Sequence, residues 1–106
     1  MTELDQKNEI CHKVEECYHI IGKKWMALII YTLMKEPKRF SEIHTFIPDL
    51  SKRMLTERMK ELEDTGIVIR NVIPDRPVRI EYSLTRKGND LGTALQAVEG
   101  WAEKWL

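Results

Sequence analysis

Residues 47–66 read IPDLSKRMLTERMKELEDTG, the pattern of a tight turn followed by an amphipathic helix. Pro48 favours the turn, and the hydroxyl of Ser51 can accept from the free backbone N–H groups at a helix start. Gly66 suits the left-handed position that often follows a helix. The pattern therefore predicts a helix over residues 51–65 with one apolar and one polar face.

Helical periodicity also precedes this segment. A first helix is expected from near Val14 to a stop at Gly22, a second over residues 23–34, and a short third one from a cap at Ser41. The positions expected to face inward are Val14, Cys17, Tyr18, Ile21, Trp25, Leu28, Ile29, Thr32, Leu33, Ile43, Phe46 and Ile47.

After the central helix the pattern changes to alternation. Residues 67–84 predict two strands around a turn that contains Pro74 and Pro77. Thr85 is then expected to cap a final helix over residues 85–106, although Gly88 and Gly92 weaken its first turns. The order of helices and hairpin is that of a winged helix, followed by one long helix that this small core does not need.

These elements predict a single domain over residues 1–106, mainly α with a small β-hairpin. It is a winged helix-turn-helix with extra N- and C-terminal helices, preceded by an N-terminal arm over residues 1–13. The final helix repeats apolar residues along one side, which favours a homodimer interface, with a core position as the alternative. The residues expected in that interface are Leu95, Val98, Trp101 and Trp105.

The formal net charge of the 106-residue chain is zero, but the charges are unevenly distributed. Residues 51–60 hold four basic side chains against Glu57 alone. Among the first sixteen residues, acidic side chains outnumber basic ones. A local basic face is typical of phosphate binding. Double-stranded operator DNA is the partner that this distribution favours, and a solvated helix face is the alternative.

In helix-turn-helix proteins the first turns of the recognition helix meet base edges in the major groove. Arginine can bind guanine through two hydrogen bonds, and threonine can contact the methyl group of thymine. Arg76 at the hairpin tip can reach phosphates or the minor groove, and a solubilising turn is the alternative, favoured when Arg76 is taken in isolation. The expected DNA-binding residues are Lys38, Arg39, Ser51, Lys52, Arg53, Thr56, Lys60, Arg76 and Arg79.

Several function classes lack support. No apolar run is long enough to cross a membrane and no signal pattern begins the chain, so the cytoplasm is the expected location. The spacing of Cys11 and Cys17 to nearby histidines matches no standard metal motif, so no metal or cofactor is expected. Because no phosphate loop or nucleophile–base pair is visible, the chain is not expected to be an enzyme.

Cys11 precedes the first helix and neighbours His12 and Lys13. A helix N-terminus and positive charge both lower the pKa of a thiol and favour the reactive thiolate. An inert small residue near a chain end is the alternative.

Taken together, the motifs resemble those of the HxlR-type regulators, winged-helix proteins related to the MarR class. The resemblance runs from Cys11 to about Trp101. It rests on residues 21–25 (IGKKW), 38–43 (KRFSEI), 47–56 (IPDLSKRMLT), 62–63, 66–68, 70, 77 and 81–85 (EYSLT).

This resemblance implies a bacterial or archaeal regulator that binds operator DNA as a homodimer, with the first and last helices forming the dimer interface. Many such proteins carry a cysteine before the first helix, and in several it senses quinones, aldehydes or oxidants. Cys11 falls at that position, with His12 where the family usually has proline. A small electrophile or oxidant is thus the implied inducer. A winged helix that binds other proteins without DNA is the alternative function, and the neutral net charge favours it.

Overall fold

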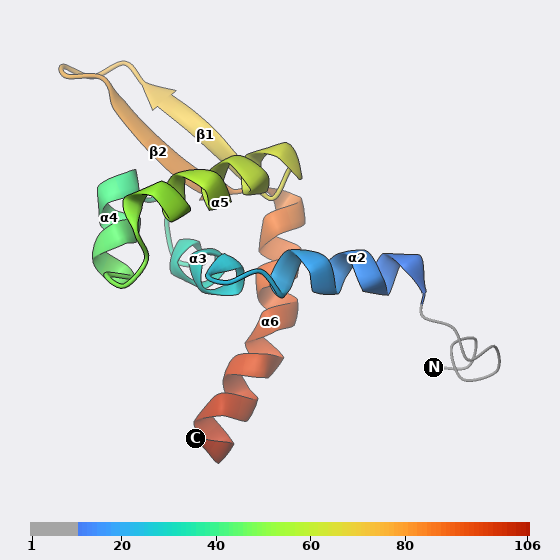
Figure 1. Cartoon of the computed structure of the whole chain (residues 1–106). Helices are drawn as coiled ribbons and strands as arrows, with labels where there is room; N and C mark the ends of the chain where they lie inside the picture. Colours follow the sequence, from blue (N-terminus) through green and yellow to red (C-terminus); the bar gives the residue numbers. More distant parts are fainter. Residues whose placement is uncertain (1–10) are drawn as a thin grey trace.

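The computed structural model of the chain describes residues 11–106, so most of the expected N-terminal arm lies outside the described residues. Within that range the chain is mainly helical with one antiparallel hairpin, the architecture of a winged helix-turn-helix (Figure 1). The elements are α2 (His12–Ile21), α3 (Met26–Leu33), α4 (Phe40–Phe46), α5 (Lys52–Asp64), β1 (Val68–Ile73), β2 (Arg79–Leu84) and α6 (Arg86–Trp105).

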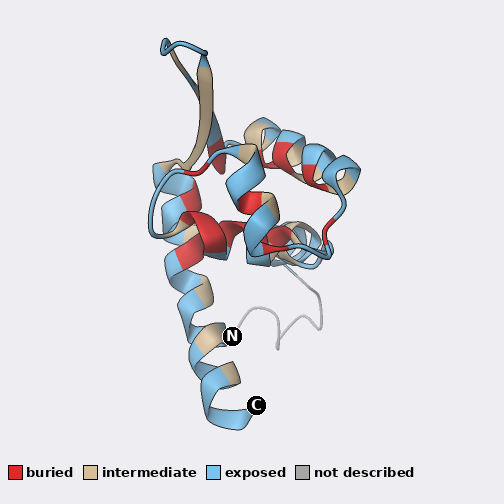
Figure 2. Cartoon of the chain, turned by 90° about the vertical axis from the view of Figure 1, so that its left-hand side faces the viewer, coloured by how far each residue is buried: buried red, intermediate tan, exposed pale blue. Residues whose placement is uncertain are grey.

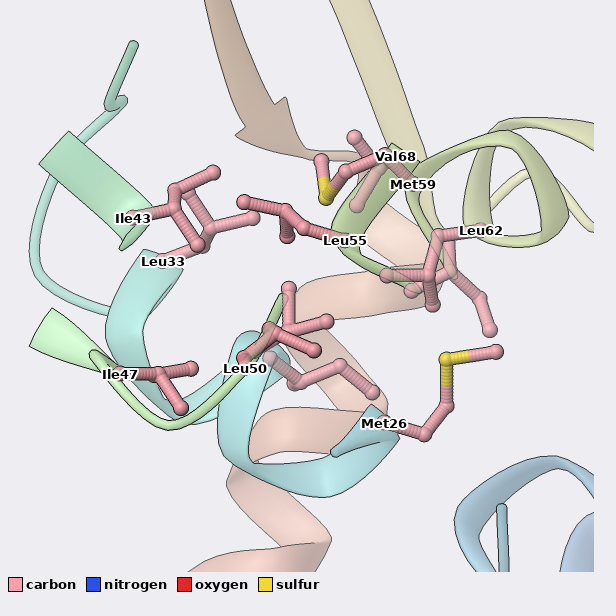
Figure 3. Packing of buried hydrophobic residues seen from close by; sticks show 12 residues of the cluster. Met26, Leu33, Ile43, Ile47, Leu50, Leu55, Met59, Leu62 and Val68 are labelled. Carbon is pink, nitrogen blue, oxygen red and sulfur yellow. The ribbon is translucent and has the colours of Figure 1, made fainter. Parts of the chain in front are cut away.

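The hydrophobic core lies where α3, α4, α5 and the start of β1 meet. Figure 2 shows the buried residues gathered there, while the hairpin tip and the second half of α6 project away from them. Leu55, Met59 and Leu62 follow one another along the inner side of α5 and are almost fully buried (Figure 3). This burial orients α5, because a helix can turn only its opposite side to solvent.

Both predicted ends of α5 are confirmed. The hydroxyl of Ser51 accepts a hydrogen bond from the Met54 backbone N–H at 3.1 Å. Gly66 adopts φ 75°, in the left-handed region that costs glycine little. The cap and the stop hold α5 at the expected length, which keeps its exposed face intact.

The hairpin pairs β1 with β2 in antiparallel register from Val68–Leu84 to Ile73–Arg79. Lys38 adds an isolated bridge to Tyr82, with N···O distances of 2.9 and 2.8 Å. This bridge ties the segment before α4 to the base of the hairpin. The sequence pattern does not reveal it, because one residue carries no periodicity.

The predicted starts of the first three helices were inaccurate. α2 begins at His12, so residues 12 and 13 belong to the helix and not to the arm. α3 begins at Met26, because Trp25 lies at φ 78° and interrupts helical geometry. A bulky residue in that region costs on the order of 1–3 kcal/mol, so tertiary contacts must stabilise this turn.

The cap of α4 is Arg39, not Ser41. The side chain of Glu42 accepts from the Arg39 backbone N–H at 2.8 Å, which satisfies one free donor at the helix start. This bond is also the main reason why the pKa of the Glu42 carboxyl lies below its ordinary value.

Four residues expected to face inward are exposed: Val14, Tyr18, Leu28 and Phe46. Each short helix buries only a narrow stripe, so residues at the edge of the predicted stripe turn to the surface. The ring of Phe46 covers the ammonium group of Lys38, 4.8 Å from its centroid. Its apolar surface therefore packs on a lysine and not on the core.

Gly88 has a packing role that the sequence pattern did not indicate. It is buried where α6 crosses the segment that enters β1, and an added Cβ would collide with the backbone carbonyl of Ile67. A backbone carbonyl cannot move aside as a flexible side chain can. The glycine that weakens the helix start thus permits the close packing that sets the direction of α6.

We expect Gly88→Ala to destabilise the fold by about 2 kcal/mol, since overpacking at a rigid contact outweighs the gain in helix propensity. Gly100→Ala is the matched control on the same helix, where an added Cβ meets nothing within 4 Å. It should stabilise the protein by about 1 kcal/mol. Thermal or urea unfolding measures both changes, and an equal gain for the two variants would contradict this role of Gly88.

Candidate nucleic-acid interface

One exposed side of α5 carries five of the predicted DNA-binding residues. Ser51, Lys52, Arg53, Thr56 and Lys60 are all exposed, the first three at the start of the helix and Thr56 and Lys60 further along its polar side. Two of the hydroxyls already have backbone partners, since Ser51 caps the helix and Thr56 donates to the Lys52 carbonyl at 2.8 Å. The face is therefore pre-ordered, with a polar and basic surface.

The basic side chains of this face are largely free. The side chain of Arg53 is 91% exposed and only approaches Glu57, with 3.8 Å between Nε and Oε1. An exposed pair at that distance contributes little, so the guanidinium can leave it for another acceptor. Within residues 11–106, neither Lys52 nor Lys60 makes an ion pair.

A second group of predicted residues meets at the hairpin. Arg39, Arg76 and Arg79 line one shallow depression of about 320 Å³ together with Asp75. Arg79 lies 3.4 Å from the Asp75 carboxylate and 3.2 Å from that of Glu81. Three arginines thus border the depression, and Arg76 makes no ion pair in the described part of the chain.

Lys38 does not belong to either group. Its side chain is only 6% exposed, lies under Phe46 and places Nζ 3.5 Å from Glu36. The backbone bridge to Tyr82 draws Lys38 inward, so its ammonium group is not presented to a partner. The expectation that Lys38 contacts DNA is therefore not supported by its position.

Arg58 is also withdrawn from the basic face, although the charge count included it. Its side chain is 14% exposed and binds Glu61, with 3.0 Å between Nη1 and Oε1. Charge counting along a sequence cannot separate a free cation from one that an internal carboxylate neutralises.

Cys11 is exposed and occupies the N-cap position of α2. The backbone N–H groups of Val14 and then Lys13 stabilise the thiolate and lower the pKa of Cys11, and the charge of Lys13 adds to this effect. Cys17 lies further along α2 and is half-buried. The arrangement favours thiolate chemistry at the helix start.

The model of the HxlR-like helix-turn-helix matches residues 20–106. The chain belongs to the HxlR family. It is 48% identical to the HTH-type transcriptional regulator YvaP of Bacillus subtilis, with 94% of this chain and 93% of that protein covered. It is 46% identical to the HTH-type transcriptional regulator YodB of the same organism, covering 92% and 88% of the two chains.

The likeness extends to the three-dimensional structure. The reduced form of YodB from B. subtilis superposes with a TM-score of 0.82 at 45% identity, covering 92% of this chain and 95% of that one. The redox regulator HypR in its oxidised form gives a TM-score of 0.82 at 37% identity, covering 87% and 95%. The HxlR-family chain is therefore a transcriptional regulator of the HxlR and MarR type.

In this HxlR-family protein, α6 leaves apolar side chains exposed. Val98, Trp101 and Trp105 are each more than half exposed, whereas Leu95 packs partly against the core. A groove of about 450 Å³ between α3 and α6 continues the surface and is lined by Leu28, Tyr31, Leu95 and Val98 among others. Contiguous apolar surface of this kind is typical of protein interfaces.

Two further observations concern residues 11–106 alone. None of their helices combines the length and the apolar character that a bilayer crossing requires. Nowhere in this range do three or more histidine, cysteine, aspartate or glutamate side chains gather as metal ligands would.

Proposed function

We propose that this regulator binds double-stranded operator DNA as a homodimer. In this proposal the exposed face of α5 enters the major groove, with Arg53 and Thr56 at base edges and Lys52 and Lys60 on phosphates. The observation that carries the proposal is the set of free basic side chains on a helix that the core holds rigidly.

The hairpin supplies the second contact. Arg39, Arg76 and Arg79 border one depression, and the hairpin tip projects on the side of the molecule where α4 lies (Figure 1). Guanidinium groups pair well with phosphate oxygens, and contacts to the backbone fix the register of a protein on DNA. We therefore place the hairpin tip against the DNA backbone beside the groove that α5 enters.

The homodimer is supported by the apolar side of α6. Val98, Trp101 and Trp105 are exposed, and their burial against another apolar surface would be favourable. A second copy of the chain presents the same surface around a two-fold axis. A dimer presents two α5 helices, which suits two half-sites about 34 Å apart on one side of the DNA.

The test is selection of bound fragments from the genome that encodes the protein, followed by gel shifts at two salt concentrations. We expect a short inverted repeat to be enriched and bound with a steep salt dependence. If no duplex were preferred over random DNA at low salt, the proposal would fail and a protein-interaction module would replace it.

We further infer that Cys11 senses an electrophile or oxidant and changes operator affinity. Structures of YodB are described as quinone-bound and diamide-treated, and HypR is described in oxidised and reduced forms. In this chain the exposed thiol and its lowered pKa support the same role. Gel shifts with and without diamide, in the wild type and in Cys11→Ser, test it. An equal response of both proteins would exclude Cys11.

The reactivity of Cys11 has its own expected result. Because the pKa of the thiol lies below its ordinary value, the thiolate is present and alkylation is fast at a lower pH than for an unperturbed cysteine. In a Cys17→Ser background, the rate of iodoacetamide labelling is measured by mass spectrometry over a range of pH. The pH at which this rate is half its maximum should lie below about 8.5. Cys11→Ser serves as the control for labelling elsewhere. A midpoint at or above that value would contradict an activated thiol.

A further inference from the structure

An ion-pair cluster of Lys23, Arg58 and Glu61 joins the turn between α2 and α3 to the C-terminal half of α5. The two carboxylate oxygens of Glu61 bind different partners: Oε2 lies 2.9 Å from Lys23 Nζ, and Oε1 lies 3.0 Å from Arg58 Nη1. Arg58 Nε also donates to the Lys24 carbonyl at 3.0 Å. Glu61 is thus the centre of a connection between residues 38 positions apart.

This connection differs from the other ion pair on α5. Arg53 and Glu57 both belong to α5 and are exposed, so their contact cannot hold the helix against a neighbour. The Arg58 side chain is 14% exposed and that of Glu61 is 32% exposed, so water screens their attraction less than that of the exposed Arg53–Glu57 pair. The contacts of Glu61 with Lys23 and Arg58 also explain why the pKa of its carboxyl lies below its ordinary value, with Lys23 the larger cause.

Apolar packing is incomplete at the same place. An open pocket of about 240 Å³ lies beside the cluster, lined by His19 and Ile20 of α2, Met26 of α3 and Asp64 of α5. Where side chains do not fill the space, dispersion contacts that would fix the angle between two helices are missing. The polar contacts of Glu61 therefore link α5 to the turn between α2 and α3 where apolar contacts do not.

The turn that receives these contacts is itself unusual. Trp25 has a left-handed backbone, and the ammonium group of Lys24 lies 5.0 Å from the centroid of its ring. A turn held in a sparsely populated conformation depends on its surroundings to keep it there. Glu61 and Arg58 bind both residues that precede Trp25.

We propose that Glu61 is a positioning residue for operator recognition, which adjusts how α5 sits against the turn between α2 and α3 by binding Lys23 and Arg58. This rests on the proposed entry of α5 into the major groove. Glu61 does not contact DNA in this arrangement. Loss of the Glu61 contacts should misplace the side chains that read the bases. It should not change the number of positive charges that bind phosphates.

The sign of the effect separates positioning from charge. Glu61→Gln removes a negative charge from the DNA-binding helix, so electrostatics alone would tighten binding to every duplex. Positioning predicts weaker binding to the operator. Lys23→Gln removes a positive charge and should reduce the preference for the operator in the same way, although its charge effect has the opposite sign.

The experiment compares wild type, Glu61→Gln, Lys23→Gln and the double variant on two duplexes of equal length. One is the duplex selected from the genome with the wild-type protein, and the other is its scrambled sequence. The matched control is Glu63→Gln, the same chemical change on the same helix at a residue that makes no ion pair within residues 11–106. Thermal unfolding of each variant reports its folded fraction.

We expect Glu61→Gln and Lys23→Gln each to lower the ratio of operator to scrambled-duplex affinity roughly five- to tenfold. The double variant should fall little further, since both residues belong to one network. Glu63→Gln should keep the wild-type ratio. The slope of log affinity against log salt should change little in all variants, because no phosphate contact is lost.

Two outcomes would overturn the proposal. One is a ratio in Glu61→Gln that equals that of Glu63→Gln, and the other is a loss that affects both duplexes equally, as simple destabilisation would cause. Lys23 lies on an exposed turn, so its variant tests the idea even if Glu61→Gln unfolds. If wild type itself does not distinguish the two duplexes, the proposed function fails and the role of Glu61 fails with it.

Discussion

Replacing Lys52 and Arg53 together by alanine should weaken operator binding roughly 100-fold, because a good base contact and a phosphate contact are each worth about 1–3 kcal/mol. Both side chains are exposed in the first turn of α5, where a recognition helix meets the edges of the bases. Neither packs on the core, so the fold should be retained. Gel shifts or fluorescence anisotropy on the selected duplex measure the loss.

The two single variants should differ in kind. Lys52→Ala should weaken binding to all sequences alike and reduce the salt slope by about one, as the loss of one phosphate contact does. Arg53→Ala should instead relax the preference at one base pair. Lys13→Ala removes a like charge at the start of α2, away from α5 and the hairpin tip, and is the control (Figure 1).

Unchanged operator affinity and unchanged salt dependence in the double variant would show that α5 does not enter the groove in this way. If Lys13→Ala lost as much operator affinity, the effect would come from the net charge of the protein and not from the position of Lys52 and Arg53.

The second large effect concerns the dimer. Trp101→Ala combined with Trp105→Ala should raise the dimer dissociation constant at least 100-fold, since buried aromatic anchors at interfaces are each worth about 2 kcal/mol or more. In the single chain these side chains are 57% and 65% exposed, so their removal costs the fold little. Sedimentation equilibrium over a range of concentrations measures the change.

Operator binding should weaken with the dimer, because a single subunit holds only one half-site. Gln96→Ala is the matched control: it lies five residues from Trp101, about 140° around the helix axis, and is exposed. That variant should remain dimeric. If the double tryptophan variant sedimented as the wild type does, α6 would not form the interface through this side.

Much of the central region could be predicted from local patterns. The apolar spacing of Leu55, Met59 and Leu62 defined which side of α5 is buried, and therefore which side is free for Arg53 and Lys60. Caps and stops such as Ser51 are also local, because they depend on the chemistry of one residue and the N–H groups just after it.

The candidate site was predictable only in part. Arg39 and Arg76 are 37 positions apart in the sequence, and only the fold brings them to one depression. Lys38 and Arg58 counted as basic residues, yet each is shielded and bound to an acidic group. Long-range pairing of this kind leaves no periodic signal, so composition overestimates the charge that a surface presents.

The sequence by itself determined the order of the elements, the inward face of α5 and the family, because helix and strand periods, capping chemistry and turn residues act over only a few neighbouring positions. Tertiary structure alone decided where α3 begins and which cations remain free. It also decided how closely α6 packs against Ile67 at Gly88. Trp25 takes a left-handed backbone directly after two residues that Glu61 and Arg58 bind from α5. Such choices depend on segments distant in the chain, which no local pattern contains.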